Sequence, residues 1–239
     1  MSVVPLHGHG AFRGHAHVRR VALFGGTFDP IHVGHIAVAR AADRRFHFNA
    51  IHFIPTACPP HKRRGSMASY TDRYAMVALA CADRPRFIAS LAESPAGHSG
   101  HEVFYSVDTV RRFKQKFHGT NTRLYFLLGA DSFLQIPTWK DYKTLLNLCD
   151  FIVASRPGFH VDALRRVIPP ELLAQPGSAH AQPNPHTIAL RRTTIYVLDT
   201  VSSRVSATEV RGHLDRSESI YGLVPFRVGK YITKQGLYR

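Results

Sequence analysis

Cysteine is scarce in this chain of 239 residues, which contains only Cys58, Cys81 and Cys149. Their number is odd, they lie far apart, and no Cys-x-x-Cys pair occurs. A disulfide framework and a cysteine-rich metal site are therefore not expected. Cys81 and Cys149 lie in apolar stretches, so we expect them to be small hydrophobic residues of the core.

Long apolar runs are also missing. No run approaches the roughly 20 residues that a membrane-spanning helix requires. The first twenty residues lack the apolar segment of a secretory signal. The sequence therefore predicts a cytoplasmic protein that has no membrane partner.

Acidic residues are few: 16 Asp and Glu stand against 31 Lys and Arg, which gives a formal net charge of +15. Such an excess predicts an anionic partner, either a nucleic acid or a small molecule rich in phosphate. The basic residues are spread along the chain, without a basic tract or an interleaved pattern of basic and aromatic residues. We therefore favour a phosphate-handling protein and keep nucleic-acid binding as a remote alternative.

The chain divides into a short leader and one long patterned region. Residues 1–18 are rich in His and Gly and have no periodicity, so we expect a disordered leader there. The hydrophobic content of 44% is enough for one sizeable core. We therefore predict that residues 19–239 form a single domain.

Apolar runs alternate with helical patterns along this region. The runs at 20–24, 50–56, 86–93, 123–131, 151–158 and 194–200 predict strands, and those at 36–46, 69–83, 105–117, 161–167, 206–214 and 225–235 predict helices. This alternation indicates an α/β fold, a Rossmann-like doubly wound parallel sheet with helices on both faces. Ligands of such sheets bind at the carboxyl ends of the strands, near the switch in strand order.

The stretch "GGTFDPIHVGH", residues 25–35, follows the first predicted strand. Gly25 and Gly26 allow the backbone to turn sharply and to approach a ligand, and a following helix would present free N–H groups to a phosphate. His32 and His35 are three residues apart, so at a helix start they share a face, from which neutral or protonated imidazoles could donate to phosphate oxygens. The alternative without a functional role is a glycine turn with two solvent-facing histidines. No Walker or Gly-x-Gly-x-x-Gly pattern is present.

Two later stretches also follow predicted strands. In "GADSFLQIPTW" (129–139), Gly129 allows close approach, and Asp131 is either an acceptor for sugar hydroxyls or a helix N-cap. In "SSRVSATEVR" (202–211), Ser206 and Glu209 form a capping box, and Arg211 lies one turn further on. A helix N-terminus beside an arginine suits an anion, although an ordinary capped surface helix has the same pattern.

These residues resemble a known family. "GGTFDPIHVGH" is similar to the signature of the His-x-Gly-His nucleotidyltransferases, and more narrowly to that of the bacterial nicotinate-nucleotide adenylyltransferases. The stretches that agree with this family, in order, are "PPHK" (59–62), "YSVDTV" (105–110), "GADSFLQIPTW", "VSATEVR" (205–211) and "ITKQGLYR" (232–239). The resemblance covers about residues 20–239. Ala207 departs from the Ser-Ser-Thr that is common in the family.

The resemblance implies transfer of AMP from ATP to nicotinate mononucleotide, with Mg²⁺ carried on the triphosphate. It implies that Asp131 faces the ribose of ATP and that Trp139 stacks on the nicotinate ring. The catalytic residues expected from the motifs and the resemblance are His32, His35, Lys62 and Arg211. Those expected to bind ATP are Gly25, Gly26, Thr27, Phe28, His32, His35, Gly129, Asp131, Ser206, Thr208 and Arg211. Those expected to bind the nicotinate nucleotide are Lys62, Tyr105, Ser106, Thr109 and Trp139.

Other acceptors stay open at this point. Nicotinamide mononucleotide differs from the nicotinate form by one charge and one amide, and pantetheine phosphate is disfavoured by Trp139 and "YSVDTV". An inactive homologue is disfavoured by the presence of both histidines. The sequence is compatible with a monomer or a homodimer.

Overall fold

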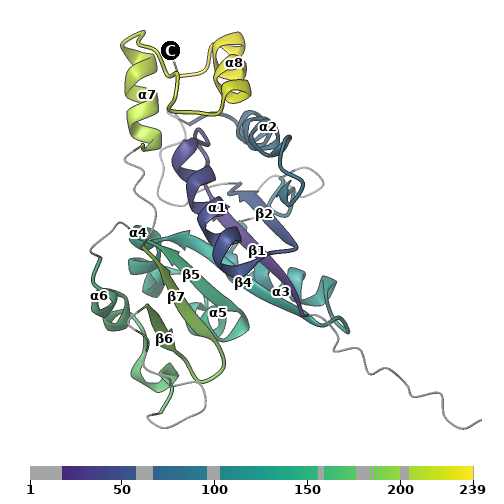
Figure 1. Cartoon of the computed structure of the whole chain (residues 1–239), viewed down its shortest axis with the longest axis vertical. Helices are drawn as coiled ribbons and strands as arrows, with labels where there is room; N and C mark the ends of the chain where they lie inside the picture. The colour runs from purple at the N-terminus through teal and green to yellow at the C-terminus, as the bar shows by residue number, and fades with distance from the viewer. Residues whose placement is uncertain are drawn as a thin grey trace, which may run out of the picture.

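A mostly parallel seven-stranded sheet forms the centre of the computed structural model (Figure 1). The structure describes residues 18–57, 67–95, 103–155, 159–175, 184, 186–199 and 205–238. The strand order is β3-β2-β1-β4-β5-β7-β6, and only β6 runs antiparallel to its neighbour, β7. The strands are β1 (Arg19–Gly26), β2 (Ala50–Pro55), β3 (Phe87–Ala89), β4 (Thr122–Gly129), β5 (Asp150–Ala154), β6 (Thr187–Ala189) and β7 (Thr194–Leu198).

Helices cover both faces of this sheet, as predicted (Figure 1). Along β1, Ala22 and Phe24 point into a core shared with α1 and α2, whereas Val21 and Leu23 point into a second core shared with α3 and α5. The helices are α1 (Val33–Phe46), α2 (Tyr70–Cys81), α3 (Ser106–Lys116), α4 (Ala130–Leu134), α5 (Tyr142–Leu148), α6 (Val161–Arg166), α7 (Ala207–Asp215) and α8 (Phe226–Gln235), with 3-10 turns at Ile136–Thr138 and Pro170–Leu172. The Rossmann-like α/β prediction is therefore confirmed.

The strand order reverses beside β1. The chain passes from β1 to β2 and β3 on one side, then returns to place β4 on the other side of β1. The connections that leave the carboxyl ends of β1 and β4 thus run to opposite sides of the pair, and at such a switch point a doubly wound sheet opens a crevice. Helices α7 and α8 stand next to each other at one end of the molecule, with the C-terminus near them (Figure 1).

Local signals explain where several helices begin and end. Ser69 caps α2 by accepting a hydrogen bond from the backbone N–H of Asp72 at 3.0 Å. The side chain of Ser206 likewise accepts from the Glu209 N–H, and the Glu209 carboxylate accepts from the Ser206 N–H. Helix α8 ends at Gly236, whose left-handed φ of 63° suits a residue without a Cβ. These caps confirm the predicted boundaries.

Several elements differ from the prediction. Strand β6 and helices α4 and α5 were not expected, because each is too short to show a clear period. Strand β3 is only three residues long, and β5 ends at Ala154, before the predicted stop. Both cysteines of the described chain, Cys81 and Cys149, are buried as expected. Most of the predicted leader lies outside the described residues, and the single-domain assignment stays a prediction. Among the described helices, none has the length and apolar character needed to cross a membrane.

Candidate active site

A cleft of about 740 Å³ opens at the carboxyl ends of β1, β4 and β5. It is lined by eight residues predicted to bind ATP: Gly25, Gly26, Thr27, Phe28, His32, His35, Gly129 and Asp131. These residues come from two stretches about one hundred positions apart, and the parallel pairing of β1 with β4 brings them together. The expectation that ligand-binding residues gather at this edge therefore agrees with the geometry.

The two histidines lie side by side at the start of α1. His32 is the N-cap of the helix and His35 its third residue, and their ring centroids are 3.7 Å apart. The backbone N–H of His32 donates to Nδ1 of His35 at 3.2 Å. Nδ1 of His35 is therefore an acceptor, so the proton of this neutral ring sits on Nε2. The predicted shared face is confirmed, and His35 has a free donor left for a ligand.

Both imidazoles are neutral at physiological pH. Burial lowers the pKa of His32 to about 4, although the Glu209 carboxylate opposes this shift. Burial, followed by repulsion from His32, holds the pKa of His35 well below its usual range. Nδ1 of His32 is buried, and no group in the described part of the chain hydrogen-bonds it. The pair therefore offers neutral hydrogen-bonding atoms rather than cations.

The turn after β1 is made differently from the prediction. Gly25 and Gly26 are the last residues of the strand, and the residue with a left-handed φ, of 49°, is Phe28. A Cβ at Gly26 would lie 3.1 Å from the Phe28 ring, so Gly26 makes room for this buried aromatic side chain. The Phe28 ring in turn packs 5.0 Å from the imidazole of His35. The glycine thus supports the site by packing instead of providing the turn itself.

The helix start is also less open than expected. Helix α1 begins at Val33, three residues before the predicted start at residue 36. The N–H of Val33 donates to the carbonyl of Leu223 at 2.9 Å, in the loop between α7 and α8. This first-turn amide is therefore already satisfied within the protein, which corrects the expectation of a free N–H for Val33 alone.

Arg211 lies against the loop that carries the histidines. Its Nη1 donates to the carbonyl of Asp29 at 2.5 Å and lies 3.7 Å from Oδ2 of the same residue. Its Nη2 approaches the Thr208 hydroxyl at 3.4 Å. Ser206 uses its hydroxyl to cap α7. Ser206, Thr208 and Arg211 do not line the cleft, whereas their neighbours Val205 and Ala207 do. Their predicted contacts with phosphate stay predictions.

Arg73 is a supporting residue that the sequence reading missed. It is fully buried, and its guanidinium donates to the carbonyls of Thr27, Ala57 and Ala68 at 2.7, 3.2 and 3.2 Å. These carbonyls follow β1, follow β2 and precede α2. A signal was present, because Arg73 occupies the helix face that also carries Met76, Val77 and Ala80. One cation thus joins the loops that border the histidine site.

Three residues predicted to bind the nicotinate nucleotide lie outside the cleft, near the start of α3: Tyr105, Ser106 and Trp139. Lys140, next to Trp139, places its ammonium 4.3 Å from the Tyr105 ring centroid and 3.2 Å from Oδ2 of Asp108. Trp139 is half-buried and packs edge-on against Phe126 at 6.2 Å. Ser106 is half-buried at the start of the same helix. Lys140 therefore joins the segment around Trp139 to the start of α3. Binding of the nicotinate ring by these residues stays a prediction.

Two of the predicted residues need separate comment. Thr109 is fully buried and its hydroxyl donates to Oε1 of Glu93 at 2.9 Å. Thr109 thus lies on the buried side of α3 with its hydroxyl bonded inside the protein, and its contact with the nicotinate nucleotide stays a prediction. Lys62 lies outside the described residues.

Glu93 is a buried carboxyl group behind this region. Burial raises its pKa from 4.5 to about 7, against hydrogen bonds from Thr109 and the backbone of Ala57. The Thr109 hydroxyl also accepts from Nη2 of Arg112 at 3.2 Å. The folded protein therefore holds this proton more tightly than the unfolded chain does.

Glu93→Gln is expected to remove one source of pH dependence. Because the folded pKa is raised, the stability that comes from protonated Glu93 is complete below about pH 4.5 and is lost as the pH rises through about 7. Between pH 6 and pH 8 the wild type should lose about 1.4 kcal/mol relative to Glu93→Gln. Urea unfolding of both proteins at the two pH values measures this difference. Glu171→Gln, at an exposed site paired with Lys143, is the control. An equal pH response of wild type and Glu93→Gln would contradict the assignment.

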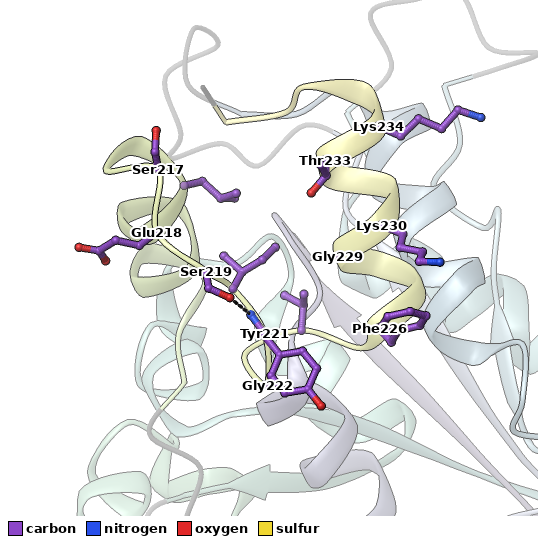
Figure 2. A pocket seen from close by; sticks show the side chains of 13 residues that line it. Ser217, Glu218, Ser219, Tyr221, Gly222, Phe226, Gly229, Lys230, Thr233 and Lys234 are labelled. Carbon is purple, nitrogen blue, oxygen red and sulfur yellow. Dashed lines mark hydrogen bonds between the residues drawn. The ribbon is translucent and has the colours of Figure 1, made fainter.

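A larger hollow of about 1100 Å³ lies between the end of α7 and α8 (Figure 2). Tyr221 and Phe226 at its border are 88% and 67% exposed. Figure 2 shows Glu218 and Lys234 on opposite sides, both pointing away from the hollow. None of the predicted site residues lines it. The chemistry is therefore concentrated in the smaller cleft.

Metal-binding side chains are sparse in the same region. Within the described ranges, no group of three or more His, Cys, Asp and Glu side chains could hold a metal ion. Of the two carboxylates that line the cleft, Asp29 is 2% exposed and bonded within the protein, whereas Asp131 is exposed. The cleft thus offers one free carboxylate, which fits a cation that arrives already bound to a triphosphate.

Known proteins with similar sequences were compared with this chain. A model of the cytidylyltransferase-like family matches residues 23–213. A protein of Moorella thermoacetica named "Probable nicotinate-nucleotide adenylyltransferase" is 37% identical over 221 residues, which is 92% of each chain. A protein of the same name from Desulfatibacillum aliphaticivorans is 36% identical and covers 92% of this chain and 99% of its own.

Solved structures agree in fold. The nicotinic acid mononucleotide adenylyltransferase of Plasmodium falciparum, complexed with NaAD, superposes with a TM-score of 0.67 at 19% identity, over 92% of this chain and 97% of its own. The same enzyme complexed with APC gives a TM-score of 0.65 at 17% identity, with the same coverage. At such low identity this likeness shows the fold alone.

Proposed function

We infer the function of this chain from its family: it belongs to the cytidylyltransferase-like family, together with the nicotinate-nucleotide adenylyltransferases that match 92% of its length. It transfers the AMP group of ATP to nicotinate mononucleotide, and the products are nicotinate adenine dinucleotide and pyrophosphate. The observation that carries this conclusion is the pair of neutral histidines at the carboxyl end of β1, in a cleft shared with β4. The reaction places the enzyme in NAD biosynthesis.

The reaction is an in-line displacement at the α-phosphorus of ATP. A 5′-phosphate oxygen of the mononucleotide forms the new P–O bond as the bond between the α-phosphorus and the bridging oxygen breaks. The electron pair of that bond leaves with pyrophosphate. The nucleophile is already an anion, so no base and no covalent enzyme intermediate are needed. The protein therefore contributes position and charge stabilisation.

The histidines supply that stabilisation as preorganised donors. The backbone N–H of His32 fixes the ring of His35, so its Nε2–H has a set direction. Negative charge grows on the phosphate oxygens as the transition state forms, and fixed donors in a buried site stabilise it without reorganisation. Neutral rings also avoid the cost of two buried cations when the site is empty. As charge accumulates beside them, their basicity rises and their hydrogen bonds strengthen.

Basic side chains neutralise the remaining phosphate charge. Arg211, 28% exposed and held against the loop by the Asp29 carbonyl, is assigned to the triphosphate by its agreement with the family motif. Lys62, which follows β2 in the sequence and lies outside the described residues, is assigned the same role by its agreement with the family motif. Mg²⁺ accompanies ATP, and its charge neutralises phosphate oxygens. Asp131 lines the cleft and accepts from ribose hydroxyls.

The acceptor subsite is assigned to the region joined by Lys140. Trp139 offers part of an indole face on which a flat pyridine ring can stack, and Tyr105 and Ser106 lie at the nearby start of α3. The positive charge of Lys140 in this region favours the nicotinate carboxylate over the uncharged amide.

The wild type should prefer the nicotinate over the nicotinamide mononucleotide. The two substrates differ by the charge of the nicotinate carboxylate and its hydrogen bonds. This difference predicts that kcat/KM is about tenfold or more higher for the nicotinate mononucleotide. Parallel measurements of pyrophosphate release with the two mononucleotides test this ratio, and formation of the adenine dinucleotide confirms the product. Equal kcat/KM values would overturn the nicotinate assignment, whereas absence of both activities would overturn the proposed reaction. Pantetheine phosphate serves as the control acceptor.

A further inference from the structure

Tyr238, far from the histidines in sequence, reaches the loop that carries them. Its hydroxyl donates to Oδ1 of Asp29 at 2.7 Å. Asp29 lies three positions before His32, between the end of β1 and the start of α1. We propose that Tyr238 is a positioning residue of the nucleotide site, and that its hydroxyl sets the geometry of the Asp29–His32 segment for the triphosphate. This inference rests on the adenylyltransferase function proposed above.

Asp29 is the point at which several segments meet. It is 2% exposed, and its Oδ1 also accepts from the backbone N–H of Ala68 at 3.1 Å. Its Oδ2 lies 3.7 Å from Arg211, whose Nη1 also donates to the Asp29 carbonyl. A buried carboxylate requires such partners, because an unpaired charge away from water is costly. Tyr238 therefore supplies one of a small set of bonds that hold the loop.

Tyr238 itself is held in an unusual conformation. Its φ is 64°, in the left-handed region that disfavours residues with a Cβ, and it follows the end of α8 at Gly236. Such conformations persist where surrounding contacts compensate them, and they concentrate at functional sites. Burial raises the pKa of the Tyr238 hydroxyl, and the nearby Asp29 carboxylate raises it further. The hydroxyl is therefore a hydrogen-bond donor throughout the physiological pH range.

The same part of the chain supports the loop at two other points. Leu223 accepts from the Val33 N–H at 2.9 Å, and Arg211 holds the Asp29 carbonyl. Residues 211–238 thus contact the loop from α7, from the α7–α8 connection and from the third residue after α8. The family model matches only as far as residue 213, so Leu223 and Tyr238 lie beyond its match. We call these three contacts the loop brace.

The brace predicts a specific kinetic defect. Without the hydroxyl, Asp29 loses a charge-assisted bond, and the loop that carries His32 gains freedom. A small displacement of a positioned group lowers transition-state stabilisation strongly. Tyr238→Phe should therefore lower kcat/KM for ATP by about tenfold, while KM for nicotinate mononucleotide changes by less than about twofold. A purely structural role would lower the Tm without this split between the substrates.

The chain offers a matched control. Tyr231 on α8 donates its hydroxyl to Oδ1 of Asp72 at 2.9 Å, the same kind of bond away from the loop. Tyr231→Phe should keep wild-type kinetics within about twofold at a comparable Tm. Tyr238→Phe with wild-type kcat/KM for ATP, or an equal loss in Tyr231→Phe, would overturn the inference.

A second measurement separates this inference from the proposed reaction. Calorimetric binding of a non-hydrolysable ATP analogue with Mg²⁺ should be about tenfold weaker in Tyr238→Phe than in wild type. If the wild type binds the analogue but makes no dinucleotide, the reaction assignment fails. The difference in analogue affinity between Tyr238→Phe and wild type then tests the brace by itself. A double-mutant cycle with Asp29→Asn tests the partner. An undiminished effect of Tyr238→Phe in the Asp29→Asn background would exclude Asp29 as the route.

Discussion

Replacement of His35 by asparagine is expected to lower kcat by about 10²–10³-fold in a protein that remains folded. The side-chain oxygen of asparagine takes the place of Nδ1, so it can still accept from the backbone N–H of His32, which is 3.2 Å from Nδ1 in the native site. Asparagine does not extend to the position of Nε2, so the donor that faces the cleft is lost. The substitution therefore separates the role of His35 in capping from its role with phosphate. Pyrophosphate release under saturating substrates measures the loss.

The control lies on the same helix. His47 is the exposed C-cap of α1, with a left-handed φ of 51° that asparagine tolerates well. His47→Asn should keep wild-type kcat and Tm, since it is at the opposite end of α1 from the cleft. His35→Ala should be as inactive as His35→Asn but less stable, because it also removes the acceptor. Unchanged pyrophosphate release in either His35 variant would refute the mechanism.

Arg73→Met is expected to cost about 3–5 kcal/mol of unfolding free energy. The substitution keeps much of the side-chain volume but removes the guanidinium, so the carbonyls of Thr27, Ala57 and Ala68 lose their partner. Since the guanidinium is fully buried, no water shell is in place to replace it. Urea unfolding monitored by circular dichroism gives the change in free energy. Because one of the three carbonyls belongs to Thr27, which lines the cleft, affinity for ATP should fall as well.

Arg84→Met provides the comparison for Arg73. Arg84 is a half-buried arginine that donates to a single carbonyl, that of Ala80, at 2.7 Å. Its replacement should cost about 1 kcal/mol and leave ATP binding unchanged. Similar losses in the two variants would show that Arg73 has no special part in joining the loops. Arg73→Lys should fall near Arg73→Met, because one ammonium cannot reproduce the planar fork of donors.

Much of the sheet and its functional edge was predictable from the sequence. The strands β1, β2, β4, β5 and β7 carry apolar runs that are buried on both faces, and such runs are visible without a structure. The histidine spacing and the glycine-rich stretch after β1 predicted the shared imidazole face. These signals depend on residues that are close together in the sequence, so they can be recognised without the structure.

What the sequence could not predict depends on contacts between distant segments. The short β6 is a strand because it pairs with β7, and its own composition does not predict a strand. Nothing near Val33 predicts that its N–H meets Leu223, and nothing near Asp29 predicts Tyr238. The burial of Thr109 could have been inferred from its helix face, between Val107, Val110 and Phe113, because these residues share the period of the apolar side.

The loop brace also connects the position of the histidine loop with the folding of the chain. Its contacts join residues separated by 182 and 209 positions, so they form only after the intervening sheet has brought the two ends of the domain together. We expect such long-range contacts to be among those that open locally when the protein fluctuates. A nucleotide that binds only to the closed arrangement then adds its binding free energy to the fold by mass action. We therefore expect bound substrate to stabilise the contacts between the Asp29 loop and the C-terminal residues.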